Sequence, residues 1–307
     1  MTTNNIVYPD FDDIVVSTKT FIVMTNLVLN LKKLFDFLPI TPYTAVQKKR
    51  GRKKKLFSPS DVTSIVEDGA IVTLKYENQL KGVDLKAKKS LKKKKSKWFR
   101  NSFTVVIILD NKPINFKICQ NGMFQITGAK FDKHAEGCIE HIWNLIKDEE
   151  HNIFTFSRGS AVEAIFIPAM RNIDFSLGFL IDREKLAKYM STQTEFHSLL
   201  ETSFGYTGVN IKIPITGNIQ NMELKQIQYI GKKQITSYLS YGEYMKRLSP
   251  KEQEKKINKD RYTTFLVFHS GKVIVSSITA EFTKPAYNYF LQIISKCREQ
   301  IEEKLDV

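Results

Sequence analysis

The chain has 307 residues, of which 42% are hydrophobic and 26% charged, and its 47 Lys and Arg exceed its 32 Asp and Glu to give a net charge of +15. This composition supports a packed core and excludes a wholly disordered, collagen-like or low-complexity chain. The apolar stretches fall short of the ~20 residues that a spanning helix needs, so we expect no membrane helix. Three scattered cysteines exclude a disulfide framework and favour an intracellular compartment.

The excess positive charge is confined to two short runs. Residues 48–55 (KKRGRKKK) hold seven basic side chains and residues 86–100 (KAKKSLKKKKSKWFR) hold nine, with no acid in either run. Taking these 16 from 47 leaves 31 basic residues against 32 acidic ones, so the remainder has no bulk attraction for phosphate. We expect the runs to contact a nucleic-acid backbone. A solvated loop or a nuclear-localisation signal is the alternative.

The first half of the chain predicts a helix, a hairpin, a strand and a second helix. Residues 30–38 begin with an asparagine that can cap a helix and carry apolar residues at helical spacing. Residues 103–109 and 114–119 predict a β-hairpin around an Asp-Asn-Lys-Pro turn. A turn containing Asn-Gly leads into a strand at 123–127, and apolar residues at 139–146 predict an amphipathic helix.

The second half repeats this order. Residues 182–190 match the helix at 30–38, residues 270–276 match the turn and strand at 121–127, and a helix around 287–294 follows. We therefore predict two half-repeats, each with one insertion. The first spans residues 1–152 with a basic insertion at about 41–100, and the second spans residues 153–307 with a polar insertion at about 215–261.

The strand at 103–109 is apolar on both of its faces. Alternation places Phe103, Val105 and Ile107 on one side, and Val106 and Ile108 on the other. A sheet backed by helices on one side only should be polar on the other. Either helices cover both faces, or the open face binds something apolar.

The matched segments resemble the paired signatures of a known family. Residues 121–130 (NGMFQITGAK) and 265–276 (FLVFHSGKVIVS) are similar to the repeats of the TATA-box-binding protein, in which a Phe, a Ser-Gly-Lys turn, an apolar strand and Thr-Gly-Ala-Lys recur. The lysine-rich lead into residues 99–103 and the segment 206–212 look most like divergent versions encoded by large cytoplasmic DNA viruses. The resemblance covers the two half-repeats and leaves both insertions unmatched.

This resemblance implies an α+β fold, the TATA-box-binding-protein-like (TBP-like) saddle. Two pseudo-repeats form one curved antiparallel sheet, helices cover its convex face, and the concave face enters the minor groove of double-stranded DNA. Apolar wedges between base steps cost on the order of a few kcal/mol per step and permit a bent duplex that contacts more protein. The resemblance implies a viral transcription initiation factor that binds AT-rich DNA, with a transcription-factor-IIB-like protein and an RNA polymerase as partners, in the host cytoplasm, virion or nucleus.

The resemblance also implies a set of groove-facing residues. Phe268 occupies the wedge position before the Ser-Gly-Lys turn, with Phe204 or Tyr206 as its partner, whereas the first half has Cys119 at the equivalent position. Gln125 can donate a hydrogen bond to an adenine N3 or thymine O2. The implied DNA-binding set is Phe103, Val105, Cys119, Gln125, Thr127, Phe204, Tyr206, Phe268, Ile274 and Ser276, with phosphate contacts by Lys92, Lys93, Lys94, Lys95 and Lys97.

Enzyme chemistry is not expected. The chain has no phosphate-binding loop, dinucleotide fingerprint or His-Glu-x-x-His motif, and His134, Cys138 and His141 lack a fourth ligand at ordinary zinc spacing. We therefore expect no cofactor, no metal and no small-molecule substrate. Two other functions remain open. One is a structural or packaging adaptor that binds nucleic acid nonspecifically or holds a protein partner. The other is an RNA-binding sheet, which lacks the expected aromatic strand motifs here.

Overall fold

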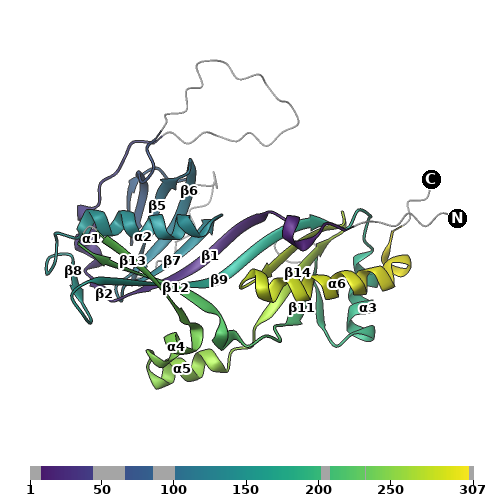
Figure 1. Ribbon diagram of the computed structural model, residues 1–307. Helices are drawn as coiled ribbons and strands as arrows, with labels where there is room; N and C mark the ends of the chain where they lie inside the picture. The colour runs from purple at the N-terminus through teal and green to yellow at the C-terminus, as the bar shows by residue number, and fades with distance from the viewer. Residues whose placement is uncertain (1–7, 44–65, 86–100, 202–207, 232, 304–307) are drawn as a thin grey trace, which may run out of the picture. The chain divides into compact units, whose positions relative to one another are not determined.

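The computed structural model describes residues 8–43, 66–85, 101–201, 208–231 and 233–303. They contain antiparallel strands and α-helices (Figure 1), so the predicted α+β class is confirmed.

The chain divides into two compact units. Unit N comprises residues 21–167 and 225–237, and unit C comprises residues 1–20, 168–224 and 238–307. These units differ from the predicted halves, since residues 1–20 group with the second half and residues 225–237 with the first. The boundary falls inside strands β1 (Val16–Thr25) and β9 (Val162–Ser176), so each unit contains part of both.

Unit N is a sheet with two helices on one face. Its strands follow the order β1–β7–β6–β5–β3–β4, and β2 pairs with β8 in a separate ladder. The elements are β2 (Leu27–Leu29), α1 (Leu31–Phe37), β3 (Ile71–Tyr76), β4 (Gln79–Gly82), β5 (Ser102–Leu109), β6 (Lys112–Cys119), β7 (Met123–Ala129), α2 (Asp132–Ile146) and β8 (Phe154–Phe156).

The core of unit N lies between this sheet and helices α1 and α2. Cys138, Ile139 and Ile142 recur at helical spacing on α2 and are buried against the sheet. On α1, Leu34 and Phe35 are buried in the same cluster. Every second residue of β5, β6 and β7 points to this side, including Ile107. The apolar rows of three strands thus form one layer under two helices.

Unit C has the same strand order around β9. The sheet follows β9–β15–β14–β11–β10, and each pair is antiparallel. The elements are a short 3₁₀ helix (Phe11–Asp13), α3 (Arg183–Gln193), β10 (His197–Glu201), β11 (Gly208–Pro214), a second 3₁₀ helix (Ile219–Asn221), α4 (Tyr241–Lys246), α5 (Pro250–Ile257), β14 (Tyr262–Phe268), β15 (Lys272–Ser277) and α6 (Ala280–Ile301).

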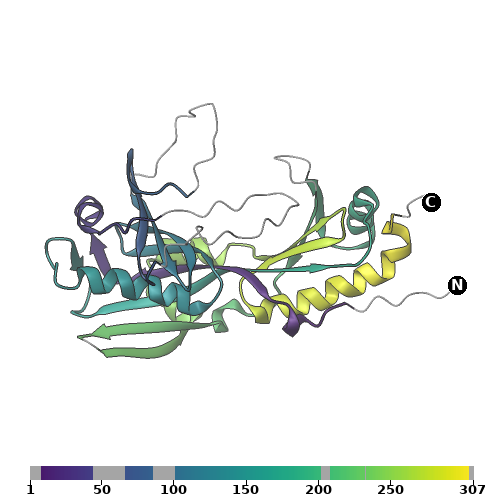
Figure 2. The ribbon, with the colours of Figure 1, turned by 90° about the horizontal axis from the view of Figure 1, so that it is seen from above.

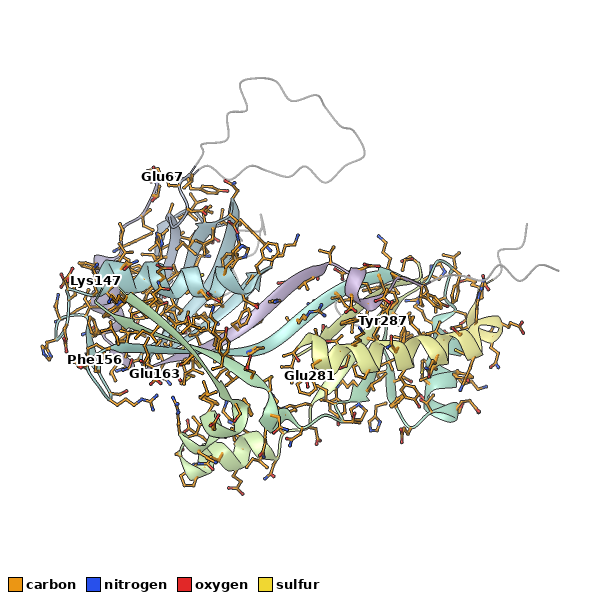
Figure 3. All side chains as sticks on the ribbon, in the orientation of Figure 1. Glu67, Lys147, Phe156, Glu163, Glu281 and Tyr287 are labelled. Atoms are coloured by element: carbon orange, nitrogen blue, oxygen red, sulfur yellow. The ribbon has the colours of Figure 1, made fainter. Side chains whose placement is uncertain are left out.

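Helices α3 and α6 cover one face of the unit C sheet. Phe290 of α6 stacks on Phe265 of β14 with ring centroids 4.3 Å apart. Tyr287, labelled in Figure 3, lies 5.1 Å from the Phe175 ring, and its hydroxyl donates to the Pro9 carbonyl at 2.7 Å. Burial raises the pKa of Tyr287 to about 12, so the hydroxyl remains a donor at neutral pH.

The two units repeat their local hydrogen bonds as well as their strand order. Gly122 and Gly271 have φ values of 72° and 73°, and a Cβ on either would lie 2.2 Å from a backbone carbonyl oxygen, that of Leu27 or Phe179. Only glycine fits such a turn without strain. The Leu29 N–H donates to the Gln120 carbonyl at 2.8 Å. In the same way, the Ile181 N–H donates to the His269 carbonyl at 2.8 Å. The predicted internal repeat therefore extends to equivalent turns.

Both predicted insertions contain regular structure. Strand β3 lies within residues 41–100 and pairs with β5, just as β10 pairs with β11 in unit C, so β3 belongs to the repeat. Its apolar IVTL run lies between the two basic runs, so the predicted boundaries of the insertion included this strand. The second insertion contains α4, α5 and a hairpin of β12 (Glu223–Ile230) and β13 (Lys233–Ser240). The hairpin joins unit N because β12 pairs with the first part of β9.

Candidate nucleic-acid interface

The sheet of unit C presents its second face away from α3 and α6. This open face carries the residues that alternate with the buried ones on each strand. The strand register aligns one cross-strand row on it: Leu199 of β10, Asn210 of β11, Leu266 of β14, Ile274 of β15 and Asp174 of β9. Leu199 is 65% exposed, and Asn210, Leu266 and Ile274 are partly exposed.

Phe268 lies at the end of β14 on this open face. It follows Leu266 by two residues, it is partly exposed, and it pairs across to Gly208. The turn after it is closed by a hydrogen bond from the Gly271 N–H to the Phe268 carbonyl at 2.9 Å. Next to it, His269 Nε2 contacts a Glu303 carboxylate oxygen at 2.6 Å. Phe268 therefore directly precedes a turn that is held by one backbone hydrogen bond and by the contact of His269 with Glu303.

A second row of unit C supplies small polar groups. Thr264 pairs with Ser276, and Ser276 pairs with Asn172 of β9. All three side chains are partly exposed on the open face. Hydroxyl and amide groups at these positions can approach base edges or sugar oxygens.

The equivalent row of unit N is polar. Register places Lys75 of β3, Thr104 of β5, Lys117 of β6 and Gln125 of β7 side by side. Lys75 forms an ion pair with Asp84 at 2.7 Å. Gln125 thus occupies the open face as predicted from the resemblance, and it stands beside a lysine.

Part of the open face of unit N is covered. Val106 and Ile108 are buried with Val72 in a small cluster, on which Tyr43, Val66 and Leu85 pack. The sequence left two alternatives for the second apolar face of this strand: helices cover it, or it binds something apolar. Neither is found here, because non-helical segments of the chain cover Val106 and Ile108. In β9, Ile165 and Ile167 lie on the face opposite to the core residue Phe166 and are also buried.

The placement of Phe103 and Val105 corrects the predicted set. Phe103 is 1% exposed and Val105 0%. The Phe103 ring lies 6.2 Å from Phe35 of α1 and 6.3 Å from Tyr76, both in edge-on geometry. These side chains belong to the helix-facing layer, since strand alternation defines two faces but does not tell which one the helices cover.

Cys119 and Thr127 lie on the open face of unit N. Cys119 occupies the position equivalent to Phe268, three residues before the turn glycine, and is partly exposed. Burial raises the pKa of its thiol, so it is a neutral group at physiological pH. The Thr127 hydroxyl donates to the Asn115 carbonyl at 3.0 Å, which leaves its lone pairs available to a donor.

Several predicted residues lie outside the described residues. These are Phe204 and Tyr206, and the phosphate-contacting Lys92, Lys93, Lys94, Lys95 and Lys97. Conversely, sequence reasoning did not select the open-face residues Lys117, Leu199, Asn210 and Leu266. Strand alternation could have identified Lys117 and Leu266. Each lies two residues before a predicted position on the same strand, Cys119 or Phe268, and therefore on the same face.

The described residues offer no metal site or membrane helix. Within the ranges listed above, no group of three or more His, Cys, Asp or Glu side chains is placed to hold a metal ion. His134 instead accepts from the Lys130 N–H at 3.2 Å through Nδ1 and contacts Asp110 at 2.8 Å through Nε2. In that same part of the chain, no helix has the length and apolar character needed to cross a bilayer.

Comparison with known proteins identifies two viral relatives. No protein-family model matches the chain. It is 29% identical over 211 residues to Uncharacterized protein 335L of Invertebrate iridescent virus 6, covering 66% of this chain and 62% of that protein. It is 30% identical over 179 residues to a TATA-box-binding protein-like protein of Acanthamoeba polyphaga mimivirus, covering 50% of this chain and 48% of the relative. Both matches span less than two thirds of the relative's length.

Among solved structures, the TBP of Methanococcus jannaschii matches with a TM-score of 0.45 and 13% identity, over 94% of this chain and 99% of the other. The sequence comparisons thus make the chain similar to viral proteins, one of which is named for its likeness to TATA-box-binding protein.

Proposed function

We propose that this protein binds and bends AT-rich duplex DNA through the minor groove, as a TBP-like transcription initiation factor. The observation that carries the proposal is the open face of unit C, where Leu266, Ile274 and Phe268 stand among small polar side chains. This face suits the minor groove of AT-rich DNA in two ways. Its hydroxyl and amide groups can donate to the hydrogen-bond acceptors that A·T pairs present there, and its apolar side chains can contact the groove when the duplex is deformed.

The charge distribution supports the same proposal. Outside the two basic runs the chain has 31 basic and 32 acidic residues, so shape and deformability have to supply most of the selectivity of the sheet. The basic runs would add phosphate contacts, and each phosphate neutralised steepens the salt dependence by roughly 0.9 log units per log unit of salt. Similarity to a viral protein named TATA-box-binding protein-like points the same way.

As an initiation factor, the protein would have a transcription-factor-IIB-like protein and an RNA polymerase as partners, inside an infected cell. The second candidate function is a structural or packaging adaptor. Two observations favour it: Cys119 replaces a wedge at the position equivalent to Phe268, and segments of the chain cover Val106 and Ile108.

A bending assay separates the two functions. The end-to-end distance of an AT-rich duplex, measured by fluorescence energy transfer, is followed on titration with the intact protein and with Phe268→Ala. Tyr289→Ala is the matched control, because Tyr289 is 45% exposed on α6 of the same unit and contacts Phe196 in the core. We expect Phe268→Ala to abolish bending and Tyr289→Ala to retain it.

A second variant lacks residues 86–97. On the proposed function it lowers affinity and flattens the salt dependence, and the residual complex is still bent. If the deletion removes all binding while Phe268→Ala bends DNA like the intact protein, the adaptor function is correct.

A further inference from the structure

The segment from α4 to the start of β14 holds two cations on a pair of tyrosine rings. The Lys256 ammonium lies over the Tyr244 ring, 5.8 Å from its centroid, and the Arg261 guanidinium lies over the Tyr241 ring at 5.4 Å. The two rings are neighbours, with centroids 5.8 Å apart. Nη2 of Arg261 also donates to the Tyr241 hydroxyl at 3.0 Å. Both cations are therefore positioned on one aromatic support.

The described residues leave these positive charges without a paired carboxylate. We call Lys256, Lys259 and Arg261 the α5–β14 cation cluster, and no carboxylate in the described part of the chain forms an ion pair with any of the three. Burial lowers the pKa of Lys256, and repulsion from Arg261 lowers it by more than the nearby Glu252 raises it. Glu252 is engaged at the start of α5, where it accepts from the Ser249 N–H at 3.2 Å. The tyrosine rings stabilise each cation separately, but only an anion would relieve the repulsion between them.

The cluster borders the open face of unit C. Arg261 directly precedes β14, and the Ile215 N–H donates to its carbonyl at 3.0 Å, which extends the pairing of β11 with β14 by one step. Tyr262, the first residue of β14, lies on the open face because it alternates with the buried Thr263. The Lys212 ammonium lies 6.0 Å from the centroid of the Tyr262 ring. Positive charge therefore continues from the cluster onto the open face.

A phosphate group is the anion that suits this arrangement. Arginine presents a planar fork of five N–H donors that matches phosphate geometry, and the bond to Tyr241 uses one of them while it fixes the orientation of the guanidinium. Lysine adds a point charge. Because the cations belong to α5, to the link after it and to β11, they can contact successive phosphates of one strand, whereas a single small anion contacts fewer of them.

We propose that the α5–β14 cation cluster binds backbone phosphates of the duplex whose minor groove contacts the open face of unit C. This inference rests on the proposed function. It adds a phosphate site that is separate from both basic runs, since all three cations lie within residues 256–261. It also gives the second insertion a role, because α4 supplies the tyrosine support and α5 supplies Lys256.

The salt dependence of DNA binding tests the proposal. Fluorescence anisotropy over a potassium chloride series gives the slope of log affinity against log salt for the intact chain, Lys256→Met and Arg261→Gln. Each variant lacks one cation, so its slope should fall by about 0.9. Lys256→Arg and Arg261→Lys keep the charge and should retain the slope of the intact chain. Lys296→Met, on α6 (the long yellow helix in Figure 2), removes a lysine outside the cluster and should also retain it.

The bending assay distinguishes failure of this inference from failure of the proposed function. All variants should still bend the AT-rich duplex, because Phe268 is unchanged, and circular dichroism establishes that each is folded. If the intact chain bends the duplex and both Lys256→Met and Arg261→Gln retain its slope, the cluster is not a phosphate contact and the proposed function stands. If the intact chain neither binds nor bends the duplex, both proposals are wrong.

Inorganic phosphate tests the other source of the same chemical group. Thermal unfolding is compared in phosphate and in chloride at equal ionic strength, for the intact chain and for Lys256→Met. We expect both proteins to respond alike, because one free anion contacts too few of the cations to bind tightly. A rise in the unfolding midpoint that phosphate causes only in the intact chain, together with unchanged slopes, would assign the cluster to free phosphate and overturn the proposal.

Discussion

Units N and C share a framework and differ on one face. In the helix-facing row, β5, β6 and β7 of unit N contribute Val105, Phe116 and Ile126, and β11, β14 and β15 of unit C contribute Ile211, Phe265 and Val275. In the open-face row, unit N has Lys75, Thr104, Lys117 and Gln125, whereas unit C has Leu199, Asn210, Leu266 and Ile274.

The comparison separates what packing requires from what a ligand would require. Side chains under α1 and α2, or under α3 and α6, have to fill a dry layer, so both units use apolar residues there. The uncovered open-face rows carry no such constraint, and they differ: the row of unit C is mostly apolar, whereas the row of unit N is cationic and hydrogen-bonding. On the proposed function, this asymmetry would fix the direction in which the protein sits on a duplex.

The largest difference in stability should come from truncating two phenylalanines that lie on opposite faces of their sheets. Phe103 is buried among Phe35 and Tyr76, so Phe103→Ala should lower the free energy of unfolding by about 3–5 kcal/mol. Phe268 is partly exposed, and its truncation should cost less than about 1 kcal/mol. Urea unfolding at equilibrium measures both. Comparable losses in the two variants would contradict the assignment of opposite faces.

Sequence patterns predicted elements better than faces. The hairpin of β5 and β6, strand β7 and the helices α1, α2, α3 and α6 were all expected, because turn residues and apolar spacing are local signals. The face on which Phe103 lies was not predicted correctly, because strand alternation separates two faces but does not say which of them the helices cover. The cover that Tyr43, Val66 and Leu85 form over Val106 depends on contacts distant in the sequence, which no local pattern carries.

The two turn glycines test whether the shared framework is equally strict in both units. Gly122→Ala and Gly271→Ala each force a Cβ to within 2.2 Å of a backbone carbonyl oxygen at positive φ. Each should cost about 3 kcal/mol or more in the free energy of unfolding. Gly231→Ala is the control. Gly231 also has a positive φ, of 59°, but a Cβ added there would have no neighbouring atom within 4 Å, so this variant should lose only about 1–2 kcal/mol of unfolding free energy. Equal losses at all three positions would refute the repeated close approach.

Exchanging one residue between the open faces should change the salt dependence of DNA binding. If Lys117 neutralises a phosphate, Lys117→Leu reduces the slope of log affinity against log salt by about 0.9, and Leu266→Lys increases it by about as much. Fluorescence anisotropy over a potassium chloride series measures both slopes. Lys296→Leu, on α6, should leave the slope unchanged. An unchanged slope for Lys117→Leu would remove that lysine from the interface.

The smallest difference lies at the starts of α1 and α3. Asn30 accepts from the Lys33 N–H at 3.1 Å, and Asp182 accepts from the Lys185 N–H at 3.0 Å. The Lys185 N–H holds the pKa of Asp182 below its usual value, so the charged cap stabilises unit C. That contribution is complete above about pH 4, where the unfolded carboxyl is ionised, and it is lost as the pH falls through the lower folded pKa.

Asp182→Asn should therefore separate the two caps by their pH dependence. Because Asn and Asp cap comparably, the variant should stay within about 0.5 kcal/mol of the parent at pH 7. Below about pH 4 it should lose less stability than the parent, since its cap does not titrate. Asn30→Asp should introduce the opposite change at α1. Urea unfolding at several pH values measures these differences. If the parent and Asp182→Asn lose stability equally as the pH falls below about 4, the charge of the Asp182 carboxylate adds nothing to what a neutral cap provides.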